Sequence, residues 1–355
     1  MKVDIRRQQI FAAIIFLYTS VQAINIDTRV GHAQQFQSYV YGTQQTFNNG
    51  DATFGDVEFS AGILFSGGNP TITLGVTPPI STTIQGNGTI NVAHDLILNL
   101  DQIAGQVAFN ITPNNSIISL NRDLTIPNGG NVFIESITGG IIDGNNHNII
   151  LASGFPVVSF TSNPFSIHPA PPPMIITNVT FTGPSVASGG LSFSEFILFE
   201  NVGILLLSAA FPFEFEGAFI FKGQNNILGA GGTFFFLGGF LPNINYIRIA
   251  SQSRLTISPN STLQLEPAAG LGFYFDDQSS QLYLDNCTLD LFPGYTLTFT
   301  AGTVLINGVV TIKTAGKAAL QIGDGVSSAN NCEIIVLPGS KLVIDTGITF
   351  SNKNV

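Results

Sequence analysis

The adjacent carboxylates of Asp276 and Asp277 are the side chains of this sequence best suited by type to acid–base hydrolysis. A glycosidic bond is cleaved between two carboxyl groups that face each other about 5 to 9 Å apart. Neighbours on a strand point to opposite faces, so this pair converges only at a bend. The sequence favours a solvated turn here and leaves a catalytic pair as the alternative.

Asp143 and His147 bracket a Gly-Asn turn and are the best-spaced candidates for a metal ion. Asp and Asn favour such positions because their side chains cap backbone amides. A metal site needs further ligands, and no third ligand stands nearby in the sequence. We therefore expect Asp143 to serve the turn. We assign no residue to a catalytic, cofactor-binding or metal site, and we expect no cofactor.

Phenylalanine is the other residue type that points to a ligand. The chain has 30 Phe and no Trp, and Phe gathers in the segments 211–221 and 234–236. Aromatic faces can stack on pyranose rings, but large aromatic side chains more commonly fill a core. We expect these residues to fill the core and keep sugar stacking as the alternative.

Composition narrows the class of protein. Of 355 residues, 44% are apolar, which is too many for a disordered chain. Charged residues make up 10%, where an ordinary soluble domain has about 25%. The formal charge of −10 with only 12 Lys and Arg excludes a surface that follows a phosphate backbone. Nucleic acid is therefore not an expected partner.

Residues 1–23 have the pattern of a secretory signal peptide. Basic residues precede an apolar run at 10–18, and Val21-Gln22-Ala23 has the compact residues that a signal peptidase reads. The alternative is an uncleaved anchor, but the run is far shorter than the roughly 20 residues that cross a bilayer. We expect cleavage after Ala23, a mature chain without a transmembrane span, and a secreted or cell-surface location.

An internal repeat is the most informative feature of the sequence. At an offset of 45, residues 286–299 (NCTLDLFPGYTLTF) align without a gap on residues 331–344 (NCEIIVLPGSKLVI). Each copy reads as a short strand with period-two apolar residues, a turn led by Pro, and a second such strand. We expect Asn286 and Asn331 to occupy one column, two coils apart.

A shorter pattern repeats in the form Asn, small apolar, any residue, large apolar. It begins at Asn178, Asn201, Asn286 and Asn331, with separations close to one, four and two units of about 22 residues. Units of this size, with strands and turns but no helical period, are typical of a parallel β-helix. An Asn at a bend can adopt a left-handed conformation and pass a side-chain hydrogen bond to the next coil.

The expected fold class is all-β, a parallel β-helix or β-solenoid of about 22 residues per coil and roughly 14 coils. Equivalent outward positions then lie about 4.8 Å apart, where like charges repel by roughly 1 kcal/mol even in water. This spacing explains the low charge content. A two-sheet sandwich is the alternative, but it gives no reason for an ungapped 45-residue offset.

Cys287 and Cys332 are the only cysteines. If they occupy matching positions two coils apart, their Cα atoms are separated by about 9 to 10 Å. A disulfide needs less than about 7 Å. We predict two buried free thiols.

Residues 139–150 (GGIIDGNNHNII) and 176–183 (ITNVTFTG) resemble paired coils of the pectin-lyase-like superfamily. The Pro-Gly turns near residues 293 and 338 are similar to those of bacterial surface and autotransporter-passenger solenoids. The resemblance implies a right-handed β-helix with three sheets. The catalytic signatures of the superfamily's hydrolases are not matched, because Asp276-Asp277 stands alone and Arg248-Ile249-Ala250 precedes it. The resemblance is therefore to the non-catalytic surface type.

The expected organisation is a signal peptide at 1–23, an N-terminal leader or cap at 24–50, and a β-helix at 51–355 with a lateral Pro-rich loop at 163–173. The function we expect is an exported structural or adhesive solenoid whose partner is a cell-surface glycan or an envelope protein. The alternative is a polysaccharide-active hydrolase or lyase. An enzyme would bring three or more of its candidate side chains into one cleft, and these candidates are Asp143, His147, Arg248, Asp276 and Asp277.

Overall fold

The structure is a computed structural model that describes most of the chain. The described residues are the strands between 25 and 74, followed by 79–92, 95–111, 116–136, 139–152, 156–162, 172–183, 190–206, 213–229, 233–237, 247–265, 273–323, 325 and 331–354.

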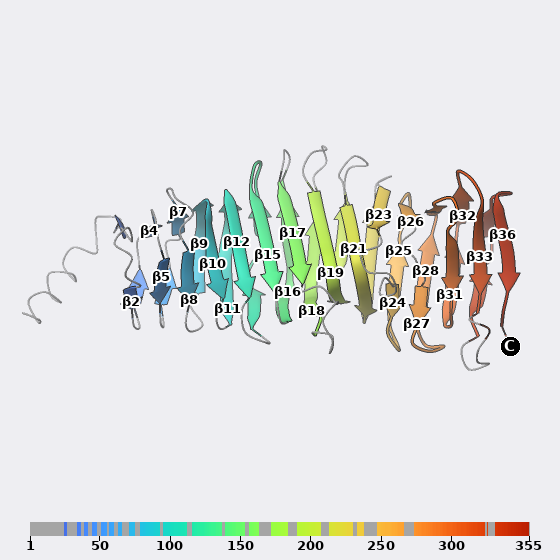
Figure 1. The fold of residues 1–355 in the computed structure, drawn as a ribbon, viewed down its shortest axis with the longest axis horizontal. Coiled ribbons are helices and arrows are strands. Elements are labelled where there is room, and N and C mark those ends of the chain that lie inside the picture. Colours follow the sequence, from blue (N-terminus) through green and yellow to red (C-terminus); the bar gives the residue numbers. More distant parts are fainter. Residues whose placement is uncertain are drawn as a thin grey trace, which may run out of the picture.

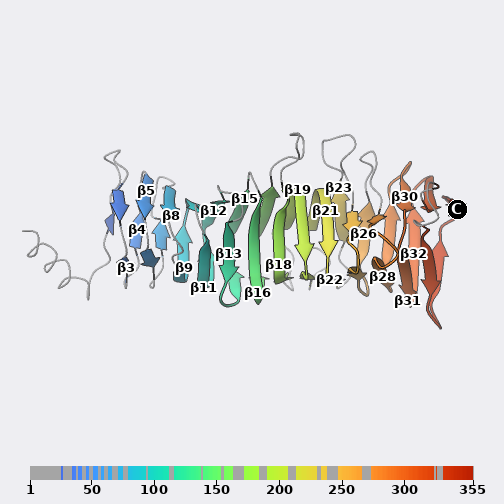
Figure 2. The same cartoon turned by 90° about the horizontal axis from the view of Figure 1, so that it is seen from below.

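Parallel strands stacked along one axis make up this structure. The described residues form 36 strands and no helix, and every strand pair is parallel. The strands lie across the long axis, and the chain advances steadily from one end to the other (Figures 1 and 2). The pairings divide the strands into three series, which we call sheets 1, 2 and 3. The fold is therefore a parallel β-helix, as the repeat predicts.

Each coil contributes one strand segment to each sheet, in the order 1, 2, 3. Six long strands bend at a corner and so belong to two sheets: β9, β11, β16 and β18 pass from sheet 3 to sheet 1, and β19 and β21 from sheet 2 to sheet 3. Sheet 1 contains β1 (Asn25–Ile26), β4 (Gln45–Phe47), β7 (Ile63–Phe65), β9 (Pro79–Gly86), β11 (Leu96–Ala104), β14 (Leu124–Ile126), β16 (Gly140–Leu151), β18 (Met174–Thr182), β20 (Gly203–Leu206), β22 (Gln224–Gly229), β25 (Arg254–Ile257), β28 (Gln281–Asp285), β31 (Thr303–Asn307) and β34 (Glu333–Val336).

Sheet 2 contains β2 (Gln34–Phe36), β5 (Asp51–Phe54), β8 (Thr71–Leu74), β10 (Gly88–Val92), β12 (Gln106–Ile111), β15 (Asn131–Ser136), β17 (Val157–Ser162), β19 (Gly190–Glu200), β21 (Phe213–Lys222), β23 (Thr233–Leu237), β26 (Thr262–Leu265), β29 (Thr288–Leu291), β32 (Val309–Thr314) and β35 (Lys341–Ile344). Sheet 3 contains the remaining parts of the long strands together with β3 (Tyr39–Tyr41), β6 (Val57–Phe59), β13 (Ile117–Leu120), β24 (Ile247–Ile249), β27 (Phe273–Phe275), β30 (Thr296–Phe299), β33 (Ala318–Ile322) and β36 (Ile348–Asn352).

The spacing between coils varies more than the sequence repeat indicates. Thr71 pairs with Thr89, a step of 18 residues, whereas Gly140 pairs with Met174, a step of 34. Between these extremes, Gly203 pairs with Asn226 after 23 residues. The described strands make up 14 coils. The extra residues of the longer coils lie between strands, so they lengthen the corners and leave the three sheets in register.

Alternation along each strand creates the core. In β10, β12 and β15, every second side chain is buried. Because the strands are parallel and in register, the buried residues of successive coils stack, as Ile90, Phe109 and Ile134 do at 0%, 1% and 6% exposure. The sheets thus enclose one continuous column of apolar side chains.

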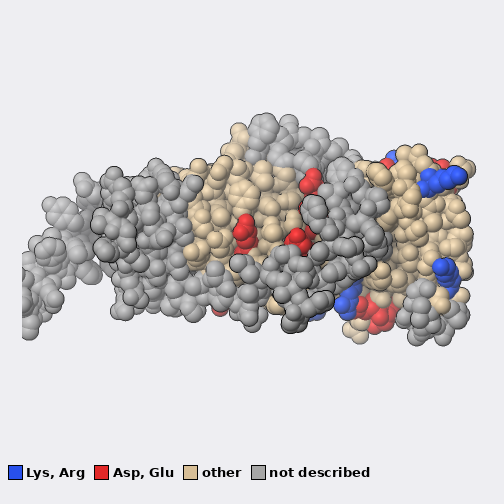
Figure 3. Space-filling model, viewed as in Figure 1, with Lys and Arg blue, Asp and Glu red and all other residues tan. Residues whose placement is uncertain are grey.

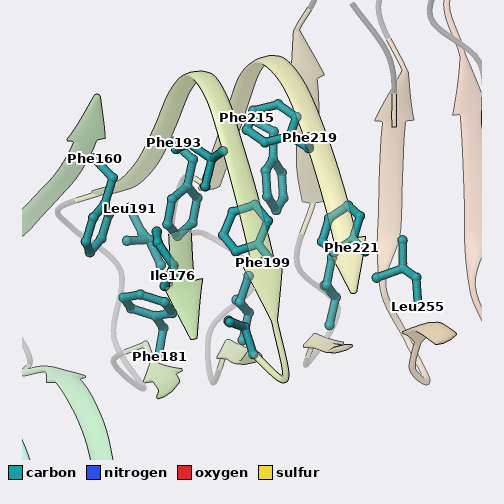
Figure 4. Close-up of a cluster of buried hydrophobic side chains, with 14 of the residues drawn as sticks. Phe160, Ile176, Phe181, Leu191, Phe193, Phe199, Phe215, Phe219, Phe221 and Leu255 are labelled. Atoms are coloured by element: carbon teal, nitrogen blue, oxygen red, sulfur yellow. The ribbon is translucent and has the colours of Figure 1, made fainter. Parts of the chain in front are cut away.

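A run of phenylalanines fills the middle of this column (Figure 4). The ring of Phe193 stacks on Phe160 of the previous coil and on Phe215 of the next, with centroids 5.1 and 5.5 Å apart. Phe219 and Phe221 are each 1% exposed. The prediction that the segment 211–221 fills the core is confirmed for Phe215, Phe219 and Phe221. The side chains of residues 234–236 lie outside the described part.

The corners use residues that tolerate a left-handed backbone. Asn178 and Asn201 have φ of 51° and 57° at the corner from sheet 3 to sheet 1. The amide of Asn201 donates to Asn178 Oδ1 at 3.5 Å, and Asn178 donates to Asp143 Oδ1 at 3.3 Å. Asn favours this conformation because its short polar side chain bonds locally. These two residues therefore form the predicted ladder at one corner.

The prediction that Asn286 and Asn331 share one column is wrong. Asn286 lies at the corner from sheet 1 to sheet 2, where the N–H of Asn260 donates to its carbonyl at 2.9 Å. Asn331 lies at the corner from sheet 3 to sheet 1, two residues before Glu333, which pairs with Thr303. Every corner needs a bend between two strands, and in each of these strands buried side chains alternate with exposed ones. The same local sequence therefore suits more than one corner, and the 45-residue offset repeats this unit instead of whole coils.

Two of the predicted segments lie outside the described residues, the signal peptide at 1–23 and all but the last two residues of the loop at 163–173. The predicted leader at 24–50 includes β1 to β4, and these strands pair in parallel with β4 to β7. They belong to the same stack as the later coils.

Candidate functional site

The candidates for catalysis fall into two separate groups, Asp143 with His147 on β16, and Arg248 with Asp276 and Asp277 several coils away. Asp143 and Asp276 lie on the same outward column, which runs from Asp143 through Thr177, Glu200 and Lys222 towards Asp276. They are five coils apart on this column, a distance of roughly 24 Å. No single cleft can bring both carboxylates to one bond.

Asp276 and Asp277 have separate partners. The carboxylate of Asp276 accepts hydrogen bonds from Arg248 Nε at 2.5 Å and from Arg248 Nη2 at 3.1 Å. The two side chains thus form a bidentate ion pair at the surface. Asp277 accepts the backbone N–H of Ser279 at 2.8 Å in the turn after β27. Hydrogen bonds from Ser251 and Ser279 lower the pKa of Asp277. The turn that the sequence favoured for this pair is confirmed.

Asp143 caps its own turn, whereas His147 contacts a different carboxylate. Asp143 Oδ1 accepts the backbone N–H of Asn145 at 3.0 Å, which confirms the predicted cap. The carboxylate that His147 Nδ1 contacts, at 3.6 Å, is that of Asp123 and not that of Asp143. Hydrogen bonds from Asn148 lower the pKa of Asp123. Within the described ranges, no three His, Cys, Asp or Glu side chains are grouped so that they could hold a metal ion.

A pair of glutamates at the corner from sheet 2 to sheet 3 was missed by the sequence reasoning. Glu195 pairs with Gly217 and Ser194 with Glu216, so the two glutamates come from neighbouring coils. Burial, and then the charge of Glu216, raise the pKa of Glu195. Glu195 also has φ of 74°, which is unusual for a side chain of this kind. A carboxyl group with a raised pKa beside a second one can transfer protons.

The outward side chains of sheet 2 form a flat polar surface from β10 to β21, which we call the sheet 2 face. Two columns of side chains make up this face. The first column consists of Thr89, Ala108, Phe133, Ser159, Ser192 and Glu214. The second, beside it, consists of Asn91, Asn110, Glu135, Thr161, Ser194 and Glu216. Asn110 donates to Asn91 at 3.2 Å, and Ser192 to Ser159 at 3.0 Å. Neighbouring coils thus satisfy one another's polar groups without charge.

A shallow hollow of about 190 Å³ opens on the sheet 2 face. Its lining is Asn87, Gly88, Thr89, Gln106, Ala108 and Phe133. Phe133 is 38% exposed, whereas its neighbours along the strand, Val132 and Ile134, are buried. The alternation in β15 was a signal for this exposure, since the two aliphatic residues must point inward. A second hollow, of about 400 Å³, lies near Asn331 and Glu333.

Several of the described charged side chains on the rod are paired with an opposite charge on the adjacent coil. Lys222 pairs with Glu200 at 2.8 Å and Lys313 with Asp290 at 3.1 Å, in each case between register partners on adjacent coils. Figure 3 shows acidic side chains over the middle coils, and basic and acidic side chains close together at the lower rim and towards the C-terminal coils. Like charges at equivalent outward positions of neighbouring coils would repel each other, and in these pairs the equivalent positions have opposite charges instead.

Both cysteines are free and buried, as predicted, but for another geometric reason. Cys287 precedes β29 of sheet 2 and Cys332 precedes β34 of sheet 1, so they lie at different corners instead of in one column. Burial raises the pKa of each thiol to about 12. Such thiols are poor nucleophiles.

Comparison with known proteins gives no relative. No family model matches the chain, and neither a curated protein nor a solved structure matches it. Among the residues that the structure describes, there is no helix long and apolar enough to cross a membrane.

Proposed function

We propose that this protein is an exported, rod-shaped scaffold whose sheet 2 face makes adhesive contacts at a cell surface. The observation that carries the proposal is the stack of in-register coils, which extends one flat polar face over many strands. A surface of this kind offers many weak contacts at regular spacing, which suits an extended partner. The expected partners are a cell-surface glycan or an envelope protein.

The chemistry of the individual carboxylates supports this proposal. Asp276 is engaged by Arg248, Asp277 caps its own turn, and Asp143 joins the ladder through Asn178. Each therefore has a structural partner. The resemblance of the coil motifs to non-catalytic members of the pectin-lyase-like superfamily supports the same proposal, as does the signal-peptide pattern at residues 1–23 for export.

Binding of the purified mature chain to immobilised cell-surface glycans and envelope proteins tests the proposal. Ser192→Lys places a long charged side chain on the sheet 2 face and should weaken binding. Thr256→Lys makes a comparable change on the outward side of sheet 1 and should leave it intact. Equal binding by both variants would overturn the proposal. For export, the N-terminus of the extracellular protein should be Ile24.

The alternative function, a polysaccharide-active enzyme, is favoured by one observation, the closeness of Glu195 to Glu216 on the neighbouring coil. If the chain hydrolyses a polysaccharide, new reducing ends appear, and Glu195→Gln and Glu216→Gln each abolish them. Turnover that depends on both glutamates would replace the adhesive proposal with the enzymatic one.

A further inference from the structure

We propose that the hollow around Phe133 binds a ring of a neutral sugar, with the apolar face of the sugar on the phenyl ring. This inference rests on the proposed function, because it names the ligand class of the sheet 2 face. Its basis is one exposed aromatic side chain held between small neighbours and surrounded by amides and hydroxyls.

The small neighbours leave the faces of the Phe133 ring open. Within its column, Phe133 pairs with Ala108 on one side and with Ser159 on the other. Neither side chain is large enough to cover a phenyl ring. An aromatic ring on a polar surface gains free energy when a ligand covers it. Every second position of β15 is buried, so the backbone fixes Phe133 outward.

Polar groups around the hollow match the hydroxyls of a sugar. Thr89 supplies a hydroxyl, and Gln106 and Asn87 supply side-chain amides. Asn87 is positioned by its Oδ1, which accepts the backbone N–H of Gln106 at 3.0 Å. Amides and hydroxyls both donate and accept hydrogen bonds, as sugar hydroxyls do. An apolar wall with a few convergent polar groups is the usual form of a small-ligand site.

The charge of the face selects a neutral sugar over an acidic one. Its outward side chains include Glu135, Glu214 and Glu216, and those described from β10 to β21 include no Lys or Arg. Uronates, sialic acids and phosphorylated sugars would meet like charges as they approach. Neutral hexose units meet none.

Calorimetric titration with cellohexaose, laminarihexaose, maltohexaose and mannohexaose tests the inference, with hexagalacturonate as the acidic counterpart. At least one neutral hexamer should bind, and more tightly than hexagalacturonate. Phe133→Ala should weaken that binding about tenfold, and Phe133→Tyr should retain it. Ala108→Leu should also weaken binding, because it fills the hollow beside the ring.

Phe292→Ala is the matched control, since Phe292 is 43% exposed and lies away from the hollow, at the corner from sheet 2 to sheet 3 of a distant coil. It should leave the affinity unchanged. Tighter binding of hexagalacturonate, or equal affinity of the native chain and Phe133→Ala, would overturn the inference. Failure of all four neutral hexamers would overturn it too, while the Ser192→Lys comparison still decides separately whether the sheet 2 face is adhesive.

Discussion

The phenyl ring of Phe193 lies nearly parallel to that of Phe160 from the previous coil, at an interplanar angle of 15°. Phe193 also meets Phe199 edge to face at 4.9 Å. One ring thus joins two sheets and three coils in the middle of the rod.

Phe193→Ala should lower the free energy of unfolding by about 3 to 5 kcal/mol, the usual cost of removing a buried aromatic ring. Urea denaturation measures the loss, and hydrogen exchange should locate it in β17, β19 and β21. Phe292→Ala, at an exposed position, should change stability by less than about 0.5 kcal/mol. Similar losses for the two variants would contradict the stacked core.

Gly217→Ala should destabilise the corner from sheet 2 to sheet 3 by roughly 2 to 4 kcal/mol. A Cβ at Gly217 would lie 2.2 Å from the carbonyl oxygen of Glu195, and φ there is 129°. Gly294 is the control, because its φ of 88° is also unfavourable for alanine but no atom lies within 4 Å of the added Cβ. Gly294→Ala should cost only about 1 kcal/mol. Thermal melting of both variants tests this difference.

Glu195 should make the folded state less stable as pH rises. Its folded pKa is raised above the ordinary value of 4.5, so its contribution is present below the unfolded pKa and is lost as pH rises through the folded pKa. Glu195→Gln should therefore gain in melting temperature relative to the native chain between about pH 4 and pH 7. Glu135→Gln, on the sheet 2 face, is the control. A constant difference between the native chain and Glu195→Gln across that range would refute the prediction.

The two thiols should resist modification in the folded chain. Burial raises the pKa of Cys287 and of Cys332 to about 12, so little thiolate forms at pH 8. Iodoacetamide labelling followed by mass spectrometry should find both unmodified in the native protein and both modified in urea. A peptide linked through the two cysteines in a non-reduced digest would be incompatible with their separate corners.

Several features of the fold were predictable because they follow from local rules. Period-two apolar residues and Asn or Pro-Gly bends indicated short strands, and the 23-residue separation of Asn178 and Asn201 is one true coil. The assignment to corners was not predictable, because the bend at Asn286 and the bend at Asn331 follow the same local rule. Only the pairing between coils distinguishes them, and that depends on the lengths of the intervening segments.

The candidate site was predictable only in part. That Asp143 would cap its turn, and that Asp276 and Asp277 would lie in a turn, followed from their neighbours in sequence. The exposure of Phe133 was readable from the alternation of β15. The hollow was not, because it requires knowing that Ala108 lies beside Phe133 after a step of 25 residues. The closeness of Glu195 and Glu216 likewise arises from register, which has no local signal.

The hydrogen bonds between coils run along the long axis of the rod, because the strands lie across it. Axial tension spread over a whole end coil would therefore load all three ladders of an interface simultaneously, and a break would require many backbone bonds to fail together. A sideways pull on one edge strand would open them one after another. A rod built in this way should withstand axial load spread over all three sheets better than a pull on one edge strand.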